Sequence, residues 1–555
     1  MMNKTYNTWM WLFYLSSSIT FILYLWLMNF KSCLNLSVVK ISDYSISISL
    51  NLSYYNLLFI FTVLMIFSSV FHYSLHYMKE EKHVKRFLIN LLLFAISMII
   101  LISSGNLFTT LIGWDGLGVT SMLLIMYYPS DSSLKASMHT FVINRLGDCF
   151  FLIFIVLMMC QYSSMFILQT KMSSSNMNII VLMLLMLLSI TKSAQFPFSS
   201  WLTKAMEAPT PVSSLVHSST LVTAGIFILF LYHELWMEKT LIKNVLMIVS
   251  LSTLFMASIA GTLENDFKKI IAYSTLSQLG FIVFTLSLNL FDQGFLHLIM
   301  HAYFKALMFM CAGYIIHSSS GWQDIRMLTN NYSCSPMMIK MMVVSMFSLS
   351  GFPFLSGFYS KDLVIDSIMA NNYSITVMIL LITSFALTVI YTFRFCWFIT
   401  KSMKSTSYMS DKSLGMQKSM IILLICSCSM GSTILWTFSS FDPSFNCPKI
   451  LLSLLLMLVV ILFWMSPSLK KNHNYEKSMM YTYIVMKIIV NKSLKFFQKL
   501  VWNMDLLGLM GKSIKVLSNN TLWVSENFKT KKFLSNYREY FLSMITLLMV
   551  IYMLI

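Results

Sequence analysis

The segment His297-Leu-Ile-Met-His301-Ala-Tyr-Phe-Lys305-Ala-Leu-Met-Phe-Met310 places three titratable side chains four residues apart in an apolar run. On an α-helix these side chains follow one another over ~12 Å while turning only ~80° around the axis. They therefore form a polar ladder along one side of a helix that the flanking residues predict to lie in lipid. An ionisable residue at bilayer depth costs ~2.5–3.5 kcal/mol on insertion scales, so this ladder indicates proton transfer.

The composition of the whole chain predicts an all-α, polytopic membrane protein. Of its 555 residues 57% are hydrophobic and 11% are charged, and the mean hydropathy is +0.73, which excludes a soluble protein of this length. Spanning a bilayer takes ~20 apolar residues, and on that basis we expect about 16 transmembrane helices. The apolar runs lie at 8–30, 56–78, 86–104, 106–128, 138–162, 176–195, 205–232, 241–263, 268–290, 294–317, 335–370 (one long helix or two broken ones), 374–400, 419–439, 448–466 and 541–555.

The net charge of +18 is concentrated in short loops, such as Lys79 to Arg86, Lys268-Lys269 and Lys529 to Lys532. Such clusters are typical of contacts with lipid headgroups, so we expect membrane lipids and no nucleic acid as partners. None of the nine cysteines belongs to a C-x-x-C pair. The stretch Gly113-Trp-Asp-Gly-Leu-Gly118 lacks the order of a phosphate loop. We therefore expect no metal-binding and no cofactor-binding residues on this chain.

Two prolines lie where unbroken spanning helices are expected, in Phe196-Pro197-Phe198 and Phe352-Pro353-Phe354, with Lys192 and Lys361 nearby. Each proline would open its helix and free backbone carbonyls, which is tolerated at membrane depth only inside a protein or in a wet cavity. Paired breaks predict inverted repeats with functional sites at their interface. Two unrelated proline kinks are the alternative.

The tail has a different pattern from the rest of the chain. Within Met480 to Trp502, Lys487, Asn491, Lys495 and Lys499 recur every four residues beside apolar positions. This pattern predicts a basic amphipathic helix within 468–540, lying on the membrane surface or on neighbouring proteins. The final apolar run, 541–555, is expected to return into the bilayer; a free peripheral tail is the alternative.

Several further charges fall inside or beside the expected spans. Asp115 is flanked by glycines that allow another helix to approach closely. Arg145 and Asp148 are three residues apart and can pair, and both a structural salt bridge and a transport role remain open for them. A carboxylate that approaches or leaves a buried lysine makes it take up or release a proton. Asp115 and Lys192 are suitable partners if their helices touch.

Two more candidates lie between the first break and the next span. Glu207, in Lys204-Ala-Met-Glu207, is expected at a loop, where it can form an ordinary ion pair or act as a gate near the break. His217, in Val216-His-Ser-Ser-Thr220, lies among hydroxyl groups that can hold water. This setting favours a proton relay over a packed core histidine.

Four stretches resemble the core of the antiporter-like membrane subunits of respiratory complex I. They are Lys192 to Gly225, Asp266 to Gly280 with the following His297 ladder, Gln323-Asp-Ile-Arg326 and Gly357-Phe-Tyr-Ser-Lys-Asp362. The detailed match covers residues ~105–400, and the tail matches in layout the lateral helix that the shorter subunits 2 and 4 lack. Two positions depart from the family pattern: Asp115 is shorter than the usual Glu, and Thr203 replaces a proline.

The resemblance implies a domain organisation and a role for each candidate. It implies two inverted five-helix repeats, Asp115 paired with Lys192, a central relay of His217, His301 and Lys305, and Lys361 on the second broken helix. Arg145, Asp148, Glu207, His297 and Asp362 are expected to support the relay. The implied regions are 1–104, 105–263, 264–400, 401–467, 468–540 and 541–555.

The function implied by the resemblance is proton translocation across the mitochondrial inner membrane, coupled to electron transfer from NADH to ubiquinone in other subunits. FMN, iron–sulfur clusters and ubiquinone are expected on those subunits and none on this chain. The implied partners are the other membrane-arm subunits, especially the antiporter-like subunits 4 and 2, contacted through the lateral helix. A subunit of a stand-alone cation/proton antiporter with the same fold and a purely structural role are the alternatives.

Overall fold

A computed structural model of the chain describes residues 2–30, 34–41, 46–162, 178–319, 321–327, 336–370, 375–400 and 414–437. All of them belong to one compact unit, Met1–Lys470. The predicted lateral helix, the terminal anchor and the span expected at 448–466 lie outside the described residues.

The described residues form a bundle of mainly apolar helices, and eleven of its helical segments are long and apolar enough to cross a membrane. This confirms a multi-pass membrane protein, while the total of about 16 spans stays a prediction. The segments are α1 (Met2–Phe30), α2 (Tyr54–Tyr77), α3 (Val84–Ser103), α4 (Leu107–Ile125), α5 (Asp131–Tyr162), the span Thr210–Leu231, α12 (Thr240–Leu263), α13 (Phe267–Ser287), α14 (Phe291–Ser318), α17 (Ile375–Thr400) and α18 (Leu414–Thr437).

A β-hairpin between α1 and α2 shows that the all-α prediction is wrong for this segment. Strands β1 (Leu34–Ile41) and β2 (Ile46–Leu52) pair antiparallel, with a register irregularity between Ser37 and Val39. The sequence of β2, Ile-Ser-Ile-Ser-Leu-Asn-Leu, alternates apolar and polar residues, which is the period of a strand and not of a helix.

The first predicted break is present. Helix α7 (Ile179–Lys192) ends two turns before α8 (Ser200–Lys204) begins. The turn that ends α7 contains Ala194, which has a φ of 54°, and the Gln195 amide donates to the Ile190 carbonyl at 3.1 Å. The indole of Trp201 donates to the freed Thr191 carbonyl at 3.1 Å. A backbone group released by the break is thus satisfied inside the protein, as the membrane interior requires.

The second predicted break is also present, because 335–370 forms two helices instead of one. Helix α15 (Pro336–Ser350) is followed by α16 (Ser356–Ala370). Between them Gly351 has a φ of 85°, and the Phe352 amide donates to the Phe347 carbonyl at 3.0 Å. Helix α15 therefore ends in the same way as α7.

The span Thr210–Leu231 contains a local widening that the sequence did not predict. It consists of α9 (Thr210–Val212), a π-helical segment (Ser213–Thr220) and α10 (Leu221–Leu231). Every residue of the π-helical segment is buried, and the Thr220 hydroxyl donates to the Leu215 carbonyl at 2.7 Å. π-Helical turns are rare and frequently mark functional sites.

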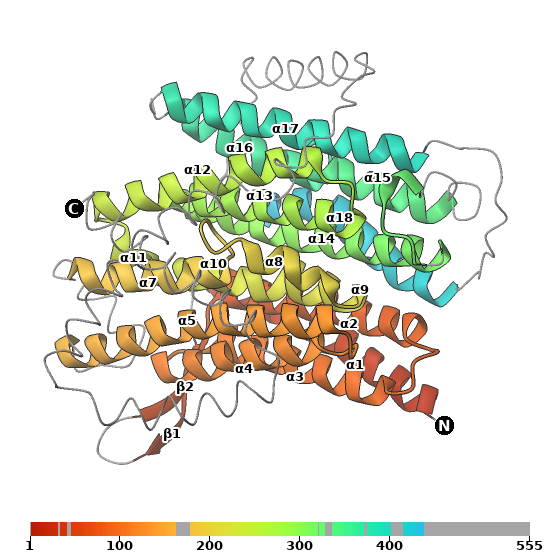
Figure 1. Cartoon of the computed structure of the whole chain (residues 1–555). Helices are drawn as coiled ribbons and strands as arrows, with labels where there is room; N and C mark the ends of the chain where they lie inside the picture. Colours follow the sequence, from red (N-terminus) through yellow and green to blue (C-terminus); the bar gives the residue numbers. More distant parts are fainter. Residues whose placement is uncertain are drawn as a thin grey trace, which may run out of the picture. The chain divides into compact units, whose positions relative to one another are not determined.

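Helix α14 is the central element of the described bundle, as Figure 1 shows. It packs against α13, α15, α16 and α18, and also against α2 and the π-helical segment from earlier in the chain. Helices α3, α4, α5 and α7 pack side by side in chain order, as do α12 and α13 (Figure 1). The helix that carries the polar ladder therefore contacts both the first and the later part of the bundle.

Glycines bring neighbouring helices onto the end of α7. A Cβ at Gly225 would lie 2.7 Å from the Ser189 carbonyl oxygen and 2.8 Å from the Ser193 amide nitrogen. Both atoms are backbone, so neither can rotate away. Gly225 thus permits the close approach of α10 to the turn of α7 that carries Lys192.

We expect Gly225→Ala to destabilise the protein by about 1–3 kcal/mol, the usual cost of overpacking. Gly118→Ala is the matched control, because a Cβ there meets only the Asn144 Cβ at 3.9 Å. Thermal unfolding in detergent measures both variants. Equal melting temperatures for Gly225→Ala and Gly118→Ala would contradict the close approach.

Candidate functional site

The polar ladder of α14 faces a second polar row on α13. The Lys305 ammonium, which is fully buried, donates to the hydroxyl of Ser274. One imidazole nitrogen of His297, Nε2, lies 3.1 Å from the Gln278 Oε1. Ser274 and Gln278 are four residues apart, so the two rows run along the contact between α13 and α14. The ladder is therefore buried between helices and does not face lipid.

The ladder continues onto the second broken helix. His297 Nδ1 lies 2.7 Å from the hydroxyl of Ser360, the residue before Lys361. Lys361 is 5% exposed, and its ammonium donates to the Leu349 carbonyl at 2.6 Å, across the break. Lys361 also interacts electrostatically with His297 and Lys305. The structure thus brings these three predicted residues into one polar cluster.

His301 and His217 are the two members of the predicted relay whose rings have no hydrogen-bond partner among the described residues. Both side chains are fully buried, and both ring nitrogens of each are unsatisfied. Buried polar groups normally have a partner, so these two imidazoles are exceptions among the described residues.

Two contacts set the level of His217 along α14. The Thr210 hydroxyl lies against Gly313, and Phe230 stacks on Phe295 with ring centroids 4.9 Å apart. The two helices are therefore antiparallel. Thr210 and Gly313 mark one level of the two helices. At a rise of 1.5 Å per residue, His217 lies ~10 Å from Thr210, and Lys305 lies ~12 Å from Gly313 in the same direction. His217 and Lys305 therefore lie at nearly the same level. The π-helical segment that carries His217 packs on α14.

Lys192 lies fully buried at the last residue of α7, next to α4. Its ammonium donates to the Trp114 carbonyl at 2.5 Å and lies 3.7 Å from the centroid of the Trp114 ring. Among the described residues it forms no ion pair with a carboxylate. A cation–π contact and a carbonyl hold this charge in place of the direct Asp115 pair that the resemblance implies.

Asp115, the residue after Trp114, pairs with Arg145. The distance from the Arg145 Nη1 to the Asp115 Oδ2 is 3.7 Å, and to the Asp148 Oδ2 it is 3.1 Å. The predicted Arg145–Asp148 pair is therefore formed, and Asp115 joins it. The Oδ1 atoms of both carboxylates are buried and have no hydrogen-bond partner in the described ranges. Asp148 and Asp115 are the charges that attract Lys192 electrostatically.

The remaining candidates from the sequence are Glu207 and Asp362. Glu207 is exposed in the short turn after α8, and Asp362 is half-buried beside Lys361, with which it interacts electrostatically. Lys268, which the sequence pattern assigns to the lipid headgroups, is only 7% exposed. Its ammonium donates to the Ala208 carbonyl at 3.0 Å, because the first turn of α13 packs on the Glu207 turn.

The partners of the ladder and of Lys192 are the residues that the sequence analysis missed. Ser274, Gln278, Ser360 and Trp114 give no signal of their own, since a serine, an amide or an indole in an apolar helix is common. The spacing of Ser274 and Gln278, equal to that of the ladder, is the signal that was available.

Comparison with known proteins identifies the family of this chain. A family model described as NADH:quinone oxidoreductase/Mrp antiporter, transmembrane region, matches residues 104–388, and one for the N-terminus of complex I chain 5 matches residues 38–88. The chain is 38% identical to NADH-ubiquinone oxidoreductase chain 5 of Aedes aegypti over 489 residues, which is 87% of this chain and 83% of that protein. The chain belongs to the NADH-ubiquinone oxidoreductase chain 5 family.

Another member of the chain 5 family matches over a shorter stretch. The protein of Caenorhabditis elegans is 43% identical over 349 residues, which is 63% of this chain and 65% of the relative. The family confirms the resemblance inferred from the four sequence stretches.

Two solved structures share the fold of this chain 5 member. A chain of the Mrp complex from Dietzia sp. DQ12-45-1b superposes with a TM-score of 0.69 at 20% identity, covering 90% of this chain and 60% of its own length. A chain of the archaeal membrane-bound sulfane sulfur reductase gives a TM-score of 0.68 at 19% identity, covering 81% and 91%.

We expect Ser274→Ala to slow proton-coupled turnover by about 10- to 100-fold, because losing a hydrogen bond to a charged group costs ~1.5–3 kcal/mol. Ser287→Ala is the matched control on the same helix, since its hydroxyl donates to the Phe284 carbonyl of its own turn at 2.6 Å. The rate of NADH oxidation by coupled membranes measures the turnover of both variants. A Ser274→Ala rate equal to that of the control would remove Ser274 from the site.

Proposed function

We propose that this chain is a membrane-arm subunit of NADH:ubiquinone oxidoreductase and translocates protons through its buried lysines and histidines. Membership of the chain 5 family supports the assembly. The observation that carries the proton path is the polar cluster on α13, α14 and α16. In it Lys305 donates to Ser274, and His297 is hydrogen-bonded to Gln278 and to Ser360, the residue before Lys361.

The partners of the lysines suit proton transfer. Lys192 and Lys361 donate to carbonyls and Lys305 donates to a hydroxyl. A neutral oxygen stabilises an ammonium ion less than a carboxylate does, so the proton is released more readily than from a permanent ion pair. A hydroxyl can also donate to the neutral amine after the proton has left. Such lysines can cycle between their two protonation states.

Charge movement near Lys192 supplies the driving step in this proposal. Asp115 and Asp148 share Arg145, and each keeps one buried oxygen without a partner. Redox energy released elsewhere in the complex shifts this carboxylate pair relative to Lys192. The shift changes the proton affinity of Lys192. The proton then passes by way of His217, His301 and Lys305 toward Lys361.

The finer assignments belong to the same proposal. The chain has no redox centre of its own, and FMN, iron–sulfur clusters and ubiquinone lie on other subunits. The complex lies in the mitochondrial inner membrane, and the tail 468–540 contacts antiporter-like subunits 4 and 2. The two inverted repeats occupy 105–263 and 264–400, and the second begins in the turn between α12 and α13.

A second function is favoured by the fold shared with the Mrp complex, namely a subunit of a stand-alone cation/proton antiporter. Native purification separates the two. Flavin and iron–sulfur subunits that co-purify with the chain support complex I, and cation-dependent proton flux without them supports the antiporter.

We expect Lys305→Met and Lys192→Met each to lower the number of protons pumped per electron in the assembled complex, because each removes a group that must bind the proton. Lys340→Met is the control, since Lys340 is an exposed lysine of α15. The measurement is proton uptake by vesicles against NADH oxidised. An undiminished ratio in both Lys305→Met and Lys192→Met would overturn the relay.

A further inference from the structure

Lys268 makes two hydrogen bonds that connect separate parts of the chain. Its ammonium donates to the carbonyls of Ala208 at 3.0 Å and Met206 at 3.4 Å. These carbonyls flank Glu207, whose carboxylate attracts the same ammonium. The first turn of α13 is thereby attached to the turn 205–209, which belongs to the first half of the chain.

The next residue, Lys269, has a different environment. Its ammonium pairs with Asp266 on the same helix turn, and its side chain is 42% exposed. Lys268 is only 7% exposed. Two adjacent lysines of equal charge thus have different roles, since Lys268 is buried and binds backbone carbonyls, whereas Lys269 is exposed and forms an ion pair within its own turn.

The turn 205–209 determines where the span with His217 begins. The Pro209 carbonyl accepts from the amides of Val212 at 3.0 Å and Ser213 at 3.3 Å, which starts the helix. His217 lies on the π-helical segment that follows directly. A shift of this turn along α13 would shift His217 relative to α14.

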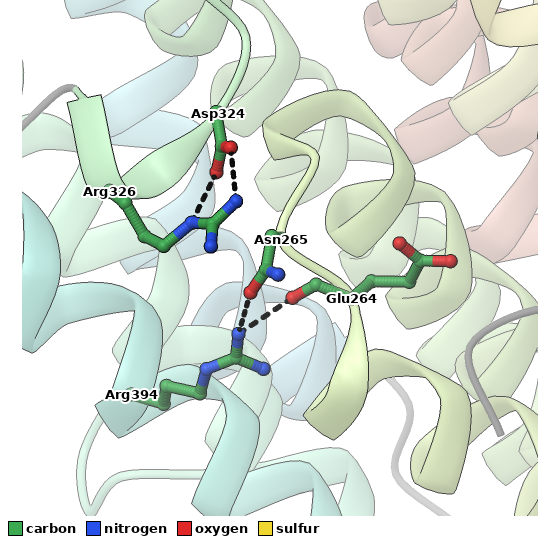
Figure 2. A network of polar contacts seen from close by, with 5 residues as sticks. All are labelled: Glu264, Asn265, Asp324, Arg326 and Arg394. Carbon is green, nitrogen blue, oxygen red and sulfur yellow. Dashed lines mark hydrogen bonds and ion pairs between the residues drawn. The ribbon is translucent and has the colours of Figure 1, made fainter. Parts of the chain in front are cut away.

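The other side of the α12–α13 junction is fixed to the later part of the chain, as Figure 2 shows. Arg394 of α17 donates to the Glu264 carbonyl at 2.8 Å and to the Asn265 side-chain oxygen at 2.7 Å. Backbone bonds add to this, since the amide of Ile325 donates to the Asn265 carbonyl at 3.0 Å. Arg326 pairs with Asp324 in the same segment, at 2.6 Å (Figure 2).

Helix α13 forms polar contacts at two levels along its axis, one at Lys268 and one at Ser274. Lys268 in its first turn holds the start of the His217 span, and Ser274, ~9 Å further along the axis, accepts a hydrogen bond from Lys305. The spacing between these attachments is fixed, because one continuous helix contains both.

We propose that Lys268 is a positioning residue for proton transfer, which holds the turn 205–209 on α13 and so keeps His217 level with Lys305. This inference rests on the proposed function. Lys268 itself carries no transferred proton in this role, since its ammonium is engaged by two carbonyls and the Glu207 charge.

The test compares three variants in the assembled complex reconstituted into liposomes. Lys268→Met removes the charge, Lys268→Arg keeps it, and Lys269→Met removes the same charge one residue away. For Lys268→Met we expect proton-coupled turnover per assembled complex to fall on the order of tenfold or more, as when a transfer geometry is displaced by about 1 Å. Lys268→Arg should regain most of this loss, and Lys269→Met should keep the wild-type rate.

The solvent deuterium isotope effect on turnover separates positioning from general stability. If His217 and Lys305 are displaced, proton transfer becomes rate-limiting and the isotope effect rises in Lys268→Met. A variant that is only less stable gives fewer complexes with an unchanged isotope effect, which would overturn the inference. If Lys305→Met loses pumping and Lys268→Met does not, only the role of Lys268 fails; if Lys305→Met pumps normally, the proposed function fails.

Discussion

A lysine ammonium inside a helix bundle must be supplied with an oxygen, because water is not freely available there and an isolated buried charge is very costly. In the described part of the bundle, Lys192, Lys305 and Lys361 each receive an uncharged oxygen from another helix or from across a break. This requirement restricts how α4, α7, α13, α15 and α16 can pack. Much of the described architecture can be understood as a way of meeting it.

The broken helices follow from the same requirement. At the second break, the Leu349 carbonyl in the last turn of α15 accepts a hydrogen bond from Lys361 of α16, and the helix ends just before Gly351, which has a positive φ. At the first break the freed Thr191 carbonyl accepts a hydrogen bond from the Trp201 indole, and the Lys192 ammonium donates to the Trp114 carbonyl on α4. A straight helix would use these carbonyls internally and leave none for a neighbouring side chain.

The sequence predicts elements better than partners. Apolar runs located nearly all described spans, and Phe196-Pro197 and Phe352-Pro353 located both breaks, because a missing amide acts locally. The ladder of His297, His301 and Lys305 was predicted from helical spacing. The bonds to Ser274 and Ser360, the exchange of Lys192 for Arg145 as the partner of Asp115, and the burial of Lys268 could not be predicted. They depend on which helices touch, and periodicity identifies a face without identifying the helix that covers it.

The charges of the cluster also restrict how protons can occupy it. Lys361 interacts electrostatically with both Lys305 and His297, and His301 interacts electrostatically with Lys305. Since positive charges in a low-dielectric interior repel strongly, a proton bound at one position disfavours a proton at the next. In the proposed relay, a proton that arrives near Lys305 would therefore promote release at Lys361, and His297 is hydrogen-bonded to Ser360 beside Lys361. The close spacing that makes the ladder costly to bury is thus also what would couple the protonation of its members.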